Sequence, residues 1–108
     1  MFFIEKGERR IRPRVEYFAA KVGVKPAGIK VKDIGYCWAS CTRNNMLHFH
    51  WKCMMVPVKI IDYLVVHELC HMHIRDHSGD FWNEVEKVMP DYQERKMWLR
   101  KQGAGLDL

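Results

Sequence analysis

The sequence VHELCHMHIRDH, residues 66–77, contains four of the chain's six histidines. Its first half matches H-E-x-x-H, with His67, Glu68 and His71. Given the numbers of histidine and glutamate in these 108 residues, chance alone produces about 0.02 matches to this pattern per chain. The match therefore favours a metal site with a catalytic base over a helix that is merely rich in histidine.

The spacing of this motif suits one metal ion when the stretch is helical. Residues four apart lie one turn apart on the same helix face, with about 6 Å between their Cβ atoms. The imidazoles of His67 and His71 can then converge on one Zn²⁺ at about 2.0–2.1 Å from each nitrogen. Glu68 lies about 100° further round the helix, within reach of a zinc-bound water whose pKa the metal lowers toward about 7. The motif thus predicts a zinc hydrolase with Glu68 as the general base.

A third protein ligand is expected, because catalytic zinc sites usually combine three protein ligands with a water. His77 lies beyond a short break after the helix, from which the chain can turn it back toward the metal. Glu84 and Glu86, on the next predicted helix, are alternatives, and we favour His77. His73 lies about 200° round the helix from His71 and is predicted to be a bystander.

Other polar residues are candidates to support such a site. Asp62 and Asp76 are possible acceptors for the imidazole N–H groups, although a capping or solvent-facing role fits each equally well. The strand that carries His48 and His50 could pair with an extended peptide, although an exposed pair of histidines is the simpler interpretation. The candidates for stabilising the oxyanion, none distinguished by its position, are Tyr36, Tyr63, Tyr92 and His48.

Apolar periodicity places the motif on a helix. Between Val58 and Met72 apolar residues recur every three or four positions, after a start at Pro57. Further helices are predicted from about Pro13 to Gly23, from Ser78 to Pro90 and from Asp91 to Gly103. Residues 29–41 and 47–51 are predicted strands with a turn at Asn44-Asn45. We predict one α+β domain over residues 1–108, in which a small antiparallel sheet packs with about four helices.

The net charge of +5 includes a dense basic patch, RRIRPR at residues 9–14 (Arg9 to Arg14). We interpret it as the solvated start of a helix; the alternative is a contact with the phosphates of a nucleic acid or a nucleotide. No apolar run is long enough for a signal peptide or a membrane span. We therefore expect a cytoplasmic protein with no membrane partner, and the sequence does not define its oligomeric state.

The four cysteines are Cys37, Cys41, Cys53 and Cys70. Because no secretory signal indicates an oxidising compartment, reduced structural thiols are predicted. Cys37 and Cys41, as C-x3-C, are similar to half of a zinc knuckle, but no second pair with suitable spacing follows.

The stretch from residue 60 to 92 resembles the catalytic part of the YgjP-like, SprT/WLM-related zinc metallopeptidases. The residues that carry the resemblance are His67, Glu68, Leu69, His71, His77, Ser78, Phe81, Trp82, Pro90, Asp91 and Tyr92. Upstream, CWASC at residues 37–41 resembles the family segment R-W-G-S-C, with Cys37 in place of arginine and Ala39 in place of glycine. The resemblance extends over about residues 9–105, nearly the whole chain.

This resemblance implies a zincin-like active-site helix and a Zn²⁺ held by His67, His71 and His77, with Glu68 as base. It also implies a peptide or an unfolded protein as substrate. In length the chain is similar to the archaeal minigluzincins, whose class name implies a glutamate as third ligand and so keeps Glu84 and Glu86 open.

The resemblance admits two other functions. One is a metal-dependent nucleoside triphosphate pyrophosphatase, in which the Arg9–Arg14 patch would hold phosphates. The other is a non-catalytic zinc-binding or DNA-associated module of the SprT-like kind, against which the intact Glu68 argues. A last hypothesis concerns the tail GAGLDL, residues 103–108, whose carboxylates could fold back onto the zinc; a frayed tail is the simpler interpretation.

Overall fold

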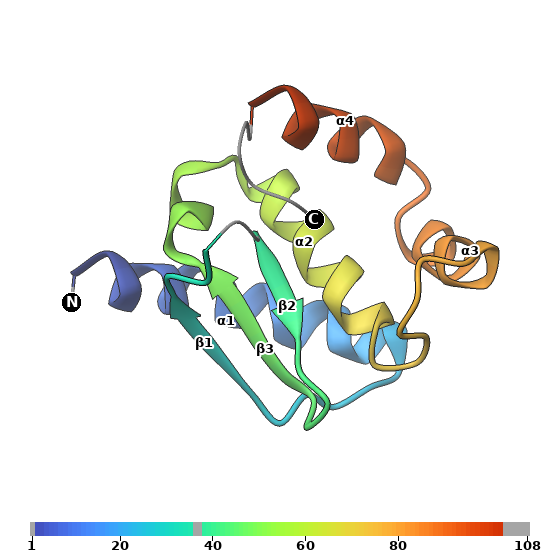
Figure 1. Ribbon diagram of the computed structural model, residues 1–108, viewed down its shortest axis with the longest axis horizontal. Coiled ribbons are helices and arrows are strands. Elements are labelled where there is room, and N and C mark those ends of the chain that lie inside the picture. The colour runs from blue at the N-terminus through green and yellow to red at the C-terminus, as the bar shows by residue number, and fades with distance from the viewer. Residues whose placement is uncertain (1, 36–37, 103–108) are drawn as a thin grey trace.

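The fold, which a computed structural model describes for residues 2–35 and 38–102, combines four α-helices with a three-stranded sheet (Figure 1). In chain order the elements are α1 (Phe2–Val22), β1 (Gly28–Lys32), β2 (Ala39–Cys41), β3 (Met46–His50), the 3-10 helix η1 (Trp51–Met55), α2 (Val58–Cys70), α3 (Gly79–Val88) and α4 (Tyr92–Gln102). The predicted α+β class with four helices is confirmed. Within the described residues, no helix is long and apolar enough to cross a membrane.

The strands β2 and β3 form the predicted hairpin. They pair antiparallel, and the turn between them closes with the backbone N–H of Thr42 donating to the Met46 carbonyl over 2.9 Å. Asn45 has a φ of +63°, in the left-handed region that asparagine adopts more readily than most residues. The turn predicted at Asn44-Asn45 is confirmed.

The first strand, β1, makes the sheet mixed rather than antiparallel. The strand order is β1-β3-β2, and β1 runs parallel to β3. The sheet is therefore mixed, whereas the sequence predicted a wholly antiparallel one. An alternating pattern identifies a strand and its buried face, but it carries no information on the direction of the neighbouring strand. The order leaves β2 at one edge of the sheet and β3 in the centre.

The helix α2 forms the centre of the core. All eleven residues from Ile60 to Cys70 are buried, because α1, α3, α4 and β2 all contact this helix. In Figure 1, α1 passes on one side of α2 and α4 lies on the other. A helix covered on all sides needs no polar face, so the prediction of a single core face was too narrow. The H-E-x-x-H motif consequently lies in the most enclosed part of the chain.

The helix α1 begins at Phe2 rather than near Pro13, so the predicted start was wrong. A proline inside a helix removes one backbone hydrogen bond and costs about 3 kcal/mol. Here the turns on both sides of it are held by tertiary packing, since Ile11 and Val15 are buried in the core. The position of the proline therefore does not determine where this helix begins.

Arginines of α1 anchor it to the segment around α2. Arg10 donates to the carbonyl of Val56 over 2.8 Å. Arg14 makes a bidentate pair with the carboxylate of Asp62 on α2, at 2.7 and 2.8 Å, and this hydrogen bond raises the pKa of Arg14. Asp62 thus uses both oxygens for a structural pair and is not an acceptor for a metal-binding imidazole.

Candidate metal centre

The last turn of α2 and the loop after it bring three histidines together. His67 lies in the helix, and His71 follows its last residue with helical backbone angles and a backbone N–H that still donates to the His67 carbonyl. The one-turn spacing of the motif is therefore kept. His77 returns from the loop before α3, and one potential ligand atom from each of the three residues lies within 4.8 Å of the others.

The geometry of this cluster, named here the three-histidine cluster (His67, His71 and His77), suits a single ion. The Nε2 atoms of His71 and His77 lie 3.1 Å apart. Two nitrogens bound at about 2.0–2.1 Å to one tetrahedral zinc lie about 3.3 Å from each other. Three imidazoles with an open fourth position form a donor set typical of catalytic zinc. The residues present fit the ion that the sequence predicts.

Neighbouring groups fix the orientation of the His71 ring. Its Nδ1 lies 2.9 Å from the carbonyl of Ile74, so a hydrogen bond there leaves Nε2 free to bind a metal. The ring also stacks on Phe81 of α3, with 4.4 Å between centroids. The acceptor is thus a backbone carbonyl rather than the predicted Asp76, which accepts from the backbone N–H of Ser78. A carbonyl in this role leaves no trace in the sequence.

Burial favours the neutral form of two histidines of the cluster, His71 and His77. It lowers the pKa of His71, and it lowers the pKa of His77 with further repulsion from the neighbouring histidines. Only a neutral imidazole offers a lone pair to a metal. The rings of His71 and His77 are therefore available as neutral ligands.

Glu68 shares the pocket of the three-histidine cluster. Its side chain is buried, and its Oε2 lies 2.8 Å from Nδ1 of His67. A hydrogen bond from this Nδ1 selects the tautomer of His67 whose Nε2 is free. The pocket has a volume of about 210 Å³. Its lining residues are Ala39, Ser40, Cys41, His67, Glu68, His71, Arg75 and His77.

The edge strand β2 forms one wall of this pocket. The strand β3 has neighbours on both sides, so it has no free edge for a substrate, and the suggestion that the His48 and His50 strand binds a peptide was wrong. On β2, the Trp38 carbonyl and the Thr42 N–H bond to β3. In an antiparallel ladder, residues alternate between bonding inward and facing the free edge. The backbone groups of Ala39 and Cys41 therefore face outward.

Arg75 is a residue of the site that the sequence reasoning missed. Its guanidinium donates to the carbonyls of Cys41 and Thr42 over 3.3 and 2.9 Å, and to Oδ1 of Asn45 over 2.9 Å. It thereby ties the loop between His71 and His77 to the β2–β3 hairpin. Its partners lie 30 to 34 positions away in the chain, so only its place between two predicted ligands could have drawn attention to it.

The alternative third ligands lie outside the pocket. Glu84 pairs with His73 across the gap between α3 and the end of α2, and Glu86 is exposed. Neither lines the pocket of the three-histidine cluster. His73 is turned toward Glu84, as expected for a bystander.

The candidate oxyanion helpers are also elsewhere. The hydroxyl of Tyr63 is buried without a partner, and burial raises its pKa. The ring of Tyr92 stacks on Trp82 at 5.3 Å. His48 is on β3, and none of these residues lines the pocket. Tyr36, Cys37 and the tail at residues 103–108 lie outside the described residues.

The cysteines in the described part of the chain, Cys41, Cys53 and Cys70, are free thiols, in agreement with the predicted reduced state. Burial raises the pKa of Cys53 and of Cys70 to about 12 in each case. Both therefore remain protonated at neutral pH, as packed core residues.

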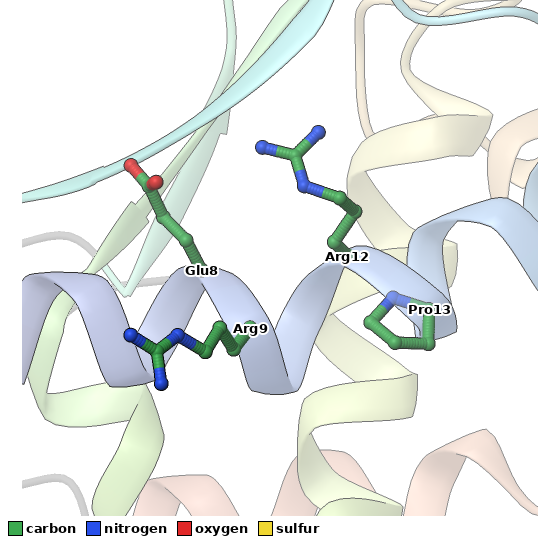
Figure 2. Close-up of a pocket in the computed structure, with 4 residues that line it drawn as sticks. All are labelled: Glu8, Arg9, Arg12 and Pro13. Atoms are coloured by element: carbon green, nitrogen blue, oxygen red, sulfur yellow. The ribbon is translucent and has the colours of Figure 1, made fainter.

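The basic patch is divided by the fold. Since Arg10 and Arg14 hold α1 in place, Arg9 and Arg12 remain as its exposed members. They flank a pocket of about 400 Å³ together with Glu8 and Pro13. Figure 2 shows Glu8 and Arg12 projecting from the same side of α1, so a carboxylate accompanies the cations. This pocket shares no residue with that of the three-histidine cluster.

Comparison with solved structures shows the same fold in two archaeal proteins. The chain is similar to the metallopeptidase zymogen abylysin of Pyrococcus abyssi, with a TM-score of 0.77 and 19% identity over 90% of this chain and 99% of the other. It is also similar to the metallopeptidase zymogen jannalysin of Methanocaldococcus jannaschii, with a TM-score of 0.75 and 18% identity over 85% and 95% of the two chains.

Sequence comparison assigns the family. No curated protein matches the chain. A family model, described as the YgjP-like metallopeptidase domain, matches residues 1–102. This match confirms the resemblance found in the motif residues: the chain belongs to the YgjP-like family of metallopeptidase domains.

Proposed function

We propose that this protein is a zinc-dependent peptidase that cleaves peptide bonds within extended or unfolded chains. The observation that carries the proposal is the convergence of the three-histidine cluster beside the buried carboxylate of Glu68. Among the described residues, the pocket that holds them is bordered by the unpaired outer edge of β2, the feature that an extended peptide requires.

The metal would be held by His67, His71 and His77. When bound, zinc would supply a lowered pKa for a water and polarisation of the scissile carbonyl. Glu68 would accept the proton of that water and deliver it to the leaving amine. Because the side chain of Glu68 is buried, its carboxylate is held in place for both proton transfers.

The substrate would be oriented by β2 and by the aromatic residues of α3. The outward N–H and C=O of Ala39 are available for main-chain hydrogen bonds, whereas Arg75 already donates to the carbonyl of Cys41. Phe81 and Trp82 pack against the imidazoles of the cluster and exclude water from that side. An extended peptide would therefore lie along β2 with its scissile bond over the cluster.

Nucleotide hydrolysis is less well supported. Phosphate transfer requires several cations at the reacting group, but the exposed arginines Arg9 and Arg12 line a separate pocket that also contains Glu8. A purely structural zinc site does not need a free fourth position or a carboxylate such as Glu68 beside it.

The proposal is tested by replacing Glu68 with glutamine. Zinc-loaded wild type is expected to cleave casein or unstructured peptides, and Glu68→Gln should lose at least about 10²–10⁴-fold in kcat because proton transfer is removed. Zinc content should stay at one ion per chain. Glu84→Gln, a change outside the pocket, is the matched control and should retain activity.

Parallel assays with nucleoside triphosphates separate the alternatives. The peptidase proposal fails if the zinc-loaded wild type cuts neither casein nor unstructured peptides. Zinc-dependent release of pyrophosphate that is lost in Glu68→Gln would establish the nucleotide function instead.

A further inference from the structure

A lysine of α4 lies beside the three-histidine cluster and takes no part in the proposed chemistry. The ammonium of Lys96 is 4.1 Å from the centroid of the Trp82 ring. Trp82 in turn stacks on His77 with an interplanar angle of 24° and 5.8 Å between centroids. Lys96 is thus two ring contacts away from the proposed metal, behind Trp82 and next to the residues that line the pocket rather than among them.

The charge of Lys96 is not neutralised within the described residues, among which no ion pair includes it. Its side chain is half-buried, and burial together with repulsion from Arg100 lowers its pKa. A partly desolvated ammonium that lacks an anion gains more from binding one than a fully solvated lysine does.

A second cation, Arg75, lines the pocket itself. Arg75 directs its guanidinium at two carbonyls and an amide oxygen, which are neutral acceptors, so its charge is also uncompensated. Among the described residues that line the pocket, Glu68 is the one carboxylate, and it lies against His67. The electrostatic field around the site therefore favours a negative group on whatever binds there.

We propose that the cleft selects peptides with an acidic residue close to the scissile bond, and that Lys96 binds the carboxylate of that residue. The ammonium of Lys96 has three N–H donors. One side of it faces the Trp82 ring, so the N–H groups on the other side can donate to a carboxylate. A basic residue at the same place in a peptide would meet Lys96 and Arg75 and be repelled. This inference rests on the proposed peptidase function and names its substrate class.

Binding measurements test the inference without relying on turnover. Zinc-loaded Glu68→Gln protein is titrated by calorimetry with matched peptides that carry glutamate, glutamine or lysine at each of three positions on either side of the scissile bond. At one position, glutamate should bind about tenfold more tightly than glutamine, and lysine should bind more weakly than both. The preference should weaken as salt is added.

Variants of Lys96 assign the preference to this residue. In the same Glu68→Gln background, Lys96→Gln should remove the difference between the glutamate and glutamine peptides, and Lys96→Arg should keep it. Lys96→Glu should reverse the preference toward the lysine peptide. Lys101→Gln removes the same charge from an exposed position on α4 and should leave the preference unchanged.

The outcomes separate this inference from the proposed function. Equal affinity for glutamate and glutamine peptides at every position overturns the inference, as does a preference that survives Lys96→Gln. Peptide cleavage by wild type without any preference for acidic residues would leave the peptidase intact and remove only the role of Lys96. The peptide series is measured on protein that keeps Lys96, so it can overturn the inference even if a Lys96 variant misfolds.

Discussion

Two pairs of closely spaced histidines in this protein differ in their surroundings. On α2, His67 and His71 are four residues apart, and His77 from the following loop meets them. On β3, His48 and His50 are two residues apart and share one face of the sheet, but in the described residues they belong to no group of three potential ligands. The difference shows that a metal site depends on what lies opposite a pair of histidines and not on their density in the sequence.

The strand pair has a structural role instead. His50 is buried, against the prediction of an exposed pair; its Nδ1 accepts from the backbone N–H of Lys52 at 3.1 Å, and its Nε2 lies 3.5 Å from Asp33. His48 is half-buried and lies opposite Lys30 on β1. Its cationic surroundings oppose the binding of a metal ion.

Zinc affinity should separate the two pairs most strongly. His71→Ala should weaken zinc binding by more than about 100-fold, the upper range for loss of a group that only supports a ligand. His50→Ala should leave the affinity unchanged. Competition with a chromophoric chelator measures both, and an equal loss in the two variants would contradict the assignment of the site to α2.

In the metal-free protein, His50→Ala should lower the free energy of unfolding more than His71→Ala does. His50→Ala removes a buried ring that accepts the N–H of Lys52 in the first turn of η1, and should cost about 1–2 kcal/mol of unfolding free energy. His71→Ala, at a half-buried position, should cost less in the metal-free protein. Urea denaturation in the presence of a chelator makes the comparison, with His48→Ala as the control on the same strand.

A smaller effect should appear in the pH dependence of the strand pair. Burial and the charges of Lys32 and Lys30 lower the pKa of His48 from 6.5. The unfolded chain therefore binds more protons than the folded one as the pH falls below about 6.5, and stability decreases in that direction. Lys32→Gln should shift the NMR titration midpoint of His48 upward toward 6.5. A wild-type midpoint at or above 6.5 would contradict this description of the strand.

The parts of the molecule that local periodicity encodes were predictable from the sequence. The helix that carries His67 and His71, the hairpin turn at Asn45 and the bystander position of His73 all follow from spacing along a short segment. The three-histidine cluster needed one further step, the return of His77 across a loop, and the structure brings it to the other two. Its identity as the ligand set remains a proposal.

The parts that depend on distant contacts were not predictable. The direction of β1 relative to β3 leaves no pattern in either strand. Asp62 is indistinguishable in sequence from a metal-supporting acid until Arg14, 48 residues away, is placed beside it. Arg75 meets the β2–β3 hairpin and Lys96 meets Trp82 of α3 through contacts between distant segments, and a lysine or arginine has no local sequence signature of such a position.

The coordination of zinc in the loaded protein tests the central claim most directly. A crystal structure of the zinc-loaded chain should show one ion bound by nitrogens of His67, His71 and His77 at about 2.0–2.1 Å, with a fourth, exchangeable oxygen ligand beside Glu68. Zinc bound by Glu84 or Glu86 in place of His77, or bound at His48 and His50, would contradict it.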